Sequence, residues 1–212
     1  MRKYLAFVLL GVLTLVGVGA AVLGGVQSGA GADLGQAVTN TLKASGYTES
    51  LVEKTPQGDQ TANVVYQSPD RLGGWLQSTG RRTYLYIIGS IEYISVTQPA
   101  KDTRVPRVYY TQETSGADAA DPAHLYLGYY DKGKSSTSGS VTTVTLSQGG
   151  QTEKLTYTVS GSYVSEFQAA TPGGTIDLDI TDVGSSPPVN LPAGAKTTET
   201  PPGSSASTGA AG

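Results

Sequence analysis

The part of the sequence that most constrains the fold is residues 48–72, where two short extended runs flank a group of turn-forming residues. Leu51 lies in the first run, and the apolar residues 64–66 form the second. Between the runs, Pro56 presets a backbone φ that suits a turn, and Gly58 tolerates a positive φ. This pattern predicts a β-hairpin. A proline downstream then interrupts the chain before a third extended run.

A second hairpin is predicted around Gly89-Ser90, because a two-residue turn with glycine first is typical of the type II′ geometry that joins antiparallel strands. The flanking runs, 82–88 and 91–96, are rich in β-branched and aromatic residues. Residues 84–88 are apolar or aromatic on both faces, which predicts a central strand covered on both sides.

Two helices are expected. Residues 33–44 carry apolar side chains at three- and four-residue spacing, with Asp33 placed to cap the first turn. Residues 121–131 present an aromatic face, with Asp121 as N-cap and Pro122 at the first helical position.

The second half of the chain predicts four more strands, at 141–147, 153–160, 163–168 and 175–181. In the last one, Asp177 and Asp179 alternate with apolar residues, as in a half-exposed strand. The polar residues 134–140 are expected to form a flexible connector. Residues 184–212 are rich in Ser, Pro, Gly, Thr and Ala and are expected to form a disordered tail.

The sum is an α+β protein: a helix, about six antiparallel strands, a second helix and four further strands. The composition agrees, since 28 Gly and 13 Tyr against 2 Phe suit a turn-rich β-protein. One domain, residues 33–183, is long enough to enclose a core. The two helices are the elements available to cover one face of the sheet.

Residues 1–32 are expected to be a targeting segment, because Arg2 and Lys3 precede a long apolar run. Two interpretations remain open. Residues 30–32 form an Ala-Gly-Ala site suited to cleavage of a signal peptide, and the apolar run is also long enough to span a bilayer as an uncleaved transmembrane anchor. Both place the domain outside the cytoplasm, either secreted into the envelope or anchored to the cell membrane.

Charge and cysteine content exclude several classes of function. The net charge is −3, so a nucleic-acid partner is not expected. The chain contains no cysteine, which excludes disulfides, thiol chemistry and a lipid attached through cysteine.

No catalytic or metal-binding pattern is present. The chain has one histidine, His124, and no nucleophile-elbow motif, so a hydrolytic triad is not expected. Asp177 and Asp179 share a strand face, but such a pair is more typical of a solvated surface than of a calcium site or an acid–base pair. We expect no cofactor, no metal and no enzymatic activity.

The hairpin at 48–72, with its Lys-Thr-Pro-x-Gly and Pro-Asp-Arg-Leu segments, resembles the first strands of LolA-like lipoprotein carriers, and most closely their actinobacterial relatives of the LprG and LppX type. Residues 157–161, 180–184 and 187–189, followed by Pro192, fit the end of that domain, so the resemblance spans roughly residues 33–196. The missing lipobox cysteine is a departure from the family.

The resemblance implies a curved antiparallel β half-barrel with helices across its concave side and an apolar cavity between them that holds a lipid or acyl chain. The candidates for the cavity lining are Leu51, Val64, Tyr66, Leu76, Leu85, Ile87, Tyr93, Leu125 and Tyr129. An alternative remains: a module that recognises an envelope protein partner, as in the RseB-like regulators of similar fold, without a lipid ligand. The Tyr-rich composition fits a lined cavity and an ordinary sheet core alike.

Overall fold

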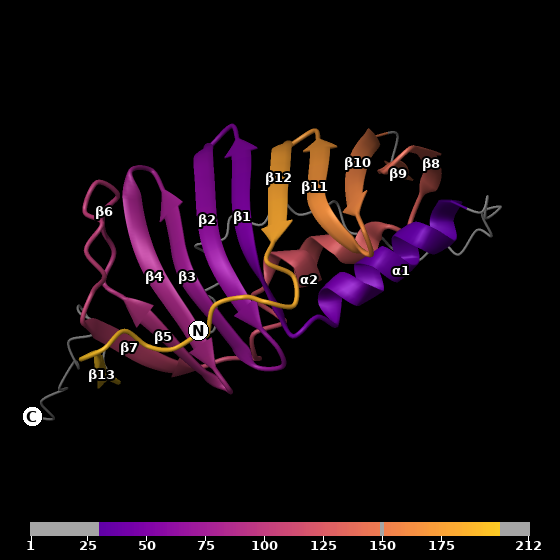
Figure 1. The fold of residues 1–212 in the computed structure, drawn as a ribbon. Helices are drawn as coiled ribbons and strands as arrows, with labels where there is room; N and C mark the ends of the chain where they lie inside the picture. Colours follow the sequence, from indigo (N-terminus) through magenta and orange to yellow (C-terminus); the bar gives the residue numbers. More distant parts are fainter. Residues whose placement is uncertain (1–29, 149–150, 200–212) are drawn as a thin grey trace, which may run out of the picture.

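The computed structural model describes residues 30–148 and 151–199, and these form one large curved sheet with two short helices beneath it (Figure 1). The strands run as follows: β1 Gly46–Thr55, β2 Gly58–Gln67, β3 Arg71–Ser78, β4 Arg81–Ile88, β5 Ile91–Ser95, β6 Gln98–Pro99, β7 Val108–Glu113, β8 Lys134–Ser138, β9 Val141–Gln148, β10 Gln151–Ser160, β11 Tyr163–Thr171, β12 Gly174–Thr181 and β13 Lys196–Thr198.

The sheet is open, and its order is β13-β7-β5-β4-β3-β2-β1-β12-β11-β10-β9-β8, with the short β6 beside β4. Every pairing is antiparallel except that of β13 with β7. The first and last long strands of the domain, β1 and β12, meet at its centre. The described residues thus contain 13 strands, where the sequence predicts about ten.

Both predicted hairpins are confirmed. β1 and β2 pair from Gly46↔Gln67 to Thr55↔Gly58, so the turn consists of only two residues, with Gly58 at φ 125°. β4 and β5 are joined through Gly89 at φ 63°, the positive φ that a type II′ turn requires at its first position.

Side chains alternate between two faces of the sheet, which we call the inner face and the outer face. The inner face, marked by Leu51 on β1 and Leu85 on β4, carries the main core together with the helices. Cross-strand pairs keep the alternation in register: Leu51 opposes Leu178, and Glu49 opposes Ile180. Asp177 is half-buried and Asp179 is exposed on the outer face, as the alternation in β12 predicts.

Helix α1, Ala30–Leu42, lies on the inner face against β8, β10 and β11. Leu34, Ala37, Val38 and Thr41 are buried, which confirms the predicted spacing. The hydroxyl of Thr41 accepts a hydrogen bond from the backbone amide of Val164, 2.9 Å away. The helix begins before Asp33, so the prediction that Asp33 caps it is wrong; the helical hydrogen bonding extends into the small residues that precede it.

Helix α2, Pro122–Tyr126, lies against β1 and continues as a 3₁₀ turn, η1, Leu127–Tyr129. The predicted cap is confirmed: an Asp121 carboxylate oxygen accepts from the backbone amide of His124. The element is shorter than the predicted helix at 121–131, because the chain tightens into 3₁₀ geometry after one turn and a half.

Residues 134–140 are not a flexible connector. Residues 134–138 form β8, which pairs with β9 from Lys134↔Thr145 to Ser138↔Val141, and all five side chains are exposed. A strand at the edge of a sheet needs only backbone hydrogen bonds to its neighbour, so a wholly polar sequence can occupy it.

Residues 184–199 are ordered on the sheet, which corrects the expectation of disorder from residue 184. Val189 is 4% exposed, and its amide donates to Gln67 while its carbonyl accepts from Arg71. The segment then ends in β13 beside β7. One buried valine and a set of backbone hydrogen bonds suffice to fix a stretch whose composition is otherwise that of a linker. The rest of the predicted tail, 200–212, lies outside the described residues.

The predicted signal peptide or anchor also lies outside the described residues, apart from the start of α1. Of the helices that the structure describes, neither combines the length and the apolar character needed to cross a membrane.

Candidate binding site on the inner face

Eight of the nine predicted lining residues lie on the inner face or on the helix that covers it. Five belong to the fully packed core, with exposed fractions from 0% to 8%: Leu51, Val64, Tyr66, Leu85 and Ile87. The other three are half-buried and pack against that core: Leu76, Leu125 and Tyr129. The structure thus brings these eight residues together in or against one hydrophobic core.

Tyr93 is the exception. It pairs with Tyr86, whose side chain lies on the outer face, and Ile94 pairs with Leu85 on the inner face. The prediction for Tyr93 is wrong by one residue, because a one-residue shift in register moves a side chain to the opposite face. Ile94, which the sequence reasoning missed, is the residue of β5 that packs against the core.

Two carboxylates lie within this apolar face and face α2. Glu49 and Glu53 are both 0% exposed and share the inner face of β1 with Leu51. Glu49 Oε1 accepts a 2.8 Å hydrogen bond from the amide of Ala123, and Glu53 Oε1 accepts a short one from the hydroxyl of Tyr126. The sequence contains the signal for this pair: Glu49 and Glu53 have the same parity as Leu51, and parity sets the face.

Asp121 and His124 extend the polar network at the start of α2. Asp121 Oδ2 accepts from the hydroxyl of Tyr47 at 2.7 Å and lies 2.7 Å from Nδ1 of His124. Asp118, just upstream, accepts from the hydroxyl of Tyr66 at 2.7 Å. The rings of Tyr47 and Tyr66 stack with centroids 4.9 Å apart. Tyr47 of β1 and Tyr66 of β2 thus hydrogen-bond to Asp121 and Asp118, one on each side of residue 120.

Burial dominates the electrostatics of this cluster. It raises the pKa of Glu49 well above its usual value, Asp121 raises it further, and the amide of Ala123 opposes the shift. The pKa of Glu53 is raised by burial, with the Tyr126 hydroxyl acting against it. Burial by itself lowers the pKa of His124, but hydrogen bonding and attraction to Asp121, with a smaller contribution from Asp118, outweigh it and the pKa rises.

Glu49 Oε2 and Asp121 Oδ1 are both buried and have no hydrogen-bond partner among the described residues. Burial and the nearby Asp121 both raise the pKa of Glu49, so the uncharged form of this carboxyl group is favoured in the folded chain. Glu49 therefore holds the start of α2 through the hydrogen bond that it accepts from the amide of Ala123.

His124, the one histidine of the chain, belongs to this cluster. The hydrogen-bonding partners of His124 are Asp121 and Tyr47, so no serine or threonine hydroxyl is aligned with it as a nucleophile. Within the ranges described, no three His, Asp or Glu side chains are grouped so that they could hold a metal ion.

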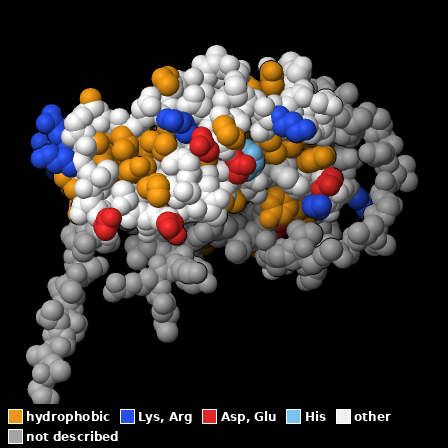
Figure 2. Space-filling model, turned by 90° about the horizontal axis from the view of Figure 1, so that it is seen from below, with side chains coloured by type: hydrophobic (Ala, Val, Ile, Leu, Met, Phe, Trp, Pro, Cys, Tyr) orange, Lys and Arg blue, Asp and Glu red, His pale blue; other side chains and the backbone are white. Residues whose placement is uncertain are grey.

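The helix-covered side of the molecule also contains a hollow of about 440 Å³ beside α1. Leu34 and Ala37 of α1 form one wall, and the turns at 139–140 and 161–162 form the other. Seen from below, this side of the molecule shows groups of hydrophobic side chains on either side of the histidine, which has acidic side chains beside it (Figure 2). The two helices thus cover different parts of the inner face: α1 lies against β8, β10 and β11, and α2 lies against β1.

Comparison with known proteins returns matches of fold. No family model matches the chain, and no curated protein is detectably similar in sequence. Among solved structures, LprF from Mycobacterium bovis matches with a TM-score of 0.45 and 13% identity over 79% of this chain and 98% of that one. The lipoprotein LppX from Mycobacterium tuberculosis matches with a TM-score of 0.49 and 11% identity over 78% of this chain and 100% of that one.

Proposed function

We propose that this protein is a non-enzymatic component of the cell envelope, located outside the cytoplasm, that binds a lipid or an acylated molecule. The acyl chain would lie against the inner face of the sheet, beneath the cover formed by α2 and the residues that lead into it. The proposed lining consists of the predicted residues on the inner face, among them Leu51, Val64 and Ile87. Leu125 and Tyr129 line the site from the cover.

One observation carries the proposal: the cover is fastened by polar contacts, although the surface beneath it is apolar. The fastening consists of Ala123 to Glu49, Tyr126 to Glu53, and the tyrosines of β1 and β2 to Asp121 and Asp118. Protein hydrogen bonds can be exchanged for bonds to water at a net cost of about 1 kcal/mol each. Apolar packing holds the cover as well, since Ala123, Tyr126 and Leu127 are buried in the core.

Lifting the cover would expose apolar surface, which an acyl chain could occupy in place of water. Burial of a methylene contributes about 0.8 kcal/mol, so twelve would contribute roughly 10 kcal/mol before the cost of immobilising the chain. Micromolar affinity is therefore attainable without any charged contact.

The test is direct titration of the full chain with dodecanoate, compared between two tryptophan variants. Leu76→Trp fills space on the inner face, whereas Val65→Trp places the same ring on the outer face, where Val65 pairs with Thr48. Both positions are half-buried, so both variants should keep the fold. We expect Leu76→Trp to lose at least tenfold in affinity and Val65→Trp to bind like the parent.

A parent chain that neither binds dodecanoate nor co-purifies with an apolar molecule would contradict the proposal. The alternative, a module that recognises a protein partner, would then be favoured. For the absence of catalysis, we expect a dodecanoyl ester to be hydrolysed no faster with the parent than with His124→Ala; a reproducible loss of hydrolysis in that variant would contradict it.

A further inference from the structure

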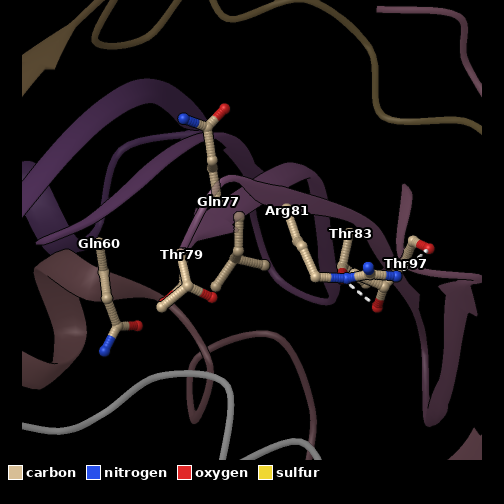
Figure 3. Close-up of a pocket in the computed structure, with 8 residues that line it drawn as sticks. Gln60, Gln77, Thr79, Arg81, Thr83 and Thr97 are labelled. Atoms are coloured by element: carbon tan, nitrogen blue, oxygen red, sulfur yellow. Dashed lines mark hydrogen bonds between the residues drawn. The ribbon is translucent and has the colours of Figure 1, made fainter. Parts of the chain in front are cut away.

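A second hollow, of about 170 Å³, opens where β2, β3 and β4 meet their turns (Figure 3). Gln60 and Thr79 lie on one side of it, and Arg81 extends along the other side to Thr97. The amide of Gln77 points away from the other labelled side chains, toward the outer face. The walls are therefore formed by hydroxyl groups, one amide and one guanidinium, with Leu76 at the base.

This hollow continues the inner face on which the acyl chain is proposed to lie. Strand pairing arranges that face in rows across β2, β3 and β4, and the four rows are Gln60–Ser78–Arg81, Ala62–Leu76–Thr83, Val64–Gly74–Leu85 and Tyr66–Leu72–Ile87. The first row is polar, the second is mixed, and the last two are apolar apart from the tyrosine hydroxyl. Six residues separate the first row from the fourth, roughly 20 Å along the strands.

Burial follows the same gradient. Arg81 is exposed and Gln60 and Ser78 are half-buried, whereas Leu72 and Ile87 in the fourth row are 0% exposed. A surface that changes in this way from polar and open to apolar and closed matches a molecule with a polar head and an apolar chain.

The charge at the open end is positive and is not neutralised. Arg81 donates a 3.2 Å hydrogen bond to the carbonyl of Thr97, and among the described residues it forms no ion pair with a carboxylate. Thr83 and Thr97 share a 2.8 Å hydrogen bond between their hydroxyls, which fixes the wall next to the guanidinium. The lining contains no carboxylate.

From these contacts we infer that the hollow at the turn end of β2–β4 binds the anionic head of an amphiphile whose chain lies along the inner face. A guanidinium with hydroxyl donors around it matches an oxyanion such as a phosphate ester or a carboxylate. A site for a neutral sugar would instead be expected to offer carboxylate acceptors or an aromatic ring for stacking, and the lining has neither. This inference rests on the proposed function and specifies the class of its ligand.

The neighbouring arginine provides a matched control. Arg82 follows directly on β4, but its side chain lies on the outer face, where it donates to Gln77 at 3.0 Å and stacks on Trp75 at 4.1 Å from the ring centroid. Arg81→Gln and Arg82→Gln therefore change the net charge equally but remove the cation from opposite faces of the sheet.

The experiment titrates the full chain and both variants with dodecyl phosphate and dodecanoate below their micellar concentrations, and with 1-dodecanol below its solubility limit. We expect the parent to bind the two anions about tenfold more tightly than the alcohol, with a preference that weakens as salt is added. Arg81→Gln should bind all three alike and with the parent's affinity for dodecanol, whereas Arg82→Gln should keep the preference.

Each other outcome contradicts a specific step. Equal binding of anion and alcohol by the parent would overturn the head-group site but leave the proposed function standing. A preference that survives Arg81→Gln, or that Arg82→Gln removes to the same extent, would show that Arg81 is not its source. Failure of all three probes to bind would overturn the proposed function and this inference with it.

Discussion

Glu49 has two structural roles: its side chain is buried in the inner face of β1, and it holds the start of α2 through a hydrogen bond. Period-2 alternation places its carboxyl group in the apolar inner face of β1, where a charge would be costly unless it were neutralised or paired. The amide of Ala123 donates to one oxygen, and burial together with the nearby Asp121 raises the pKa of the carboxyl group, which favours its uncharged form. The first turn of α2 is thereby fixed by a group that a methyl-bearing residue could not replace.

This arrangement predicts a specific pH dependence of stability. The raised pKa of Glu49 means that the folded state keeps a proton that the unfolded chain releases above about pH 4.5. Its contribution is therefore complete at low pH and is lost as the pH rises through the folded pKa, at up to about 1.4 kcal/mol per pH unit. The raised pKa values of Glu53 and His124 act in the same direction.

We therefore expect Glu49→Gln to gain stability relative to the parent as the pH rises above 4.5, measured by urea unfolding at a series of pH values. The matched control is Asp179→Asn, which removes one carboxylate from the exposed outer face of β12 and leaves the contacts of Glu49 in place. Parallel stability curves for Glu49→Gln and the parent would show that Glu49 titrates alike in the folded and unfolded states.

At the scale of elements, the sequence predicts what is determined locally. The hairpins at Gly58 and Gly89 follow from turn chemistry within a few residues, and α1 and the Asp121 cap follow from side-chain spacing. The polar strand β8 has no local signal because β9 supplies its backbone partners, and the face of Tyr93 depends on its register with β4. The buried partners of Glu49 could not be predicted, since they lie more than seventy residues away.

The C-terminal segment is such an element, and it gives a second prediction. A chain that ends after residue 184 would lose the buried side chain of Val189, its two hydrogen bonds and β13. Complete burial of a valine contributes about 1.5–3 kcal/mol, so we expect the melting temperature to fall by about 5 °C or more.

A chain that ends after residue 199 is the control, since it keeps all of these contacts and should melt with the parent. Both shortened chains can be compared by calorimetry or circular dichroism. Equal melting temperatures for all three would show that residues 185–199 contribute nothing to the stability of the sheet.

At the scale of the whole molecule, the two hollows lie at different parts of the open sheet. One lies between α1 and β8–β10, and the polar hollow with Arg81 lies at the turn ends of β2–β4. The helix α2 lies against β1, at the centre of the strand order. In the strand order, the polar hollow lies on the β2–β4 side of α2 and the hollow beside α1 lies on the β8–β10 side, so the proposed ligand would have one hollow on each side.

That compartment can be identified with a single engineered thiol, because the chain contains no cysteine. Ser136 lies on β8 with its side chain exposed, so Ser136→Cys should react fully with a maleimide without disturbing the core. If residues 1–32 direct the domain out of the cytoplasm, a membrane-impermeant maleimide will label this thiol in intact cells as strongly as after lysis.

Tyr4→Cys distinguishes the two interpretations of the leader: a cleaved signal peptide removes the thiol from the mature protein, whereas an uncleaved anchor retains it on the cytoplasmic side, where it reacts only after lysis. The cysteine-free parent gives the background. Labelling of Ser136→Cys only after lysis would place the domain in the cytoplasm and contradict an envelope function.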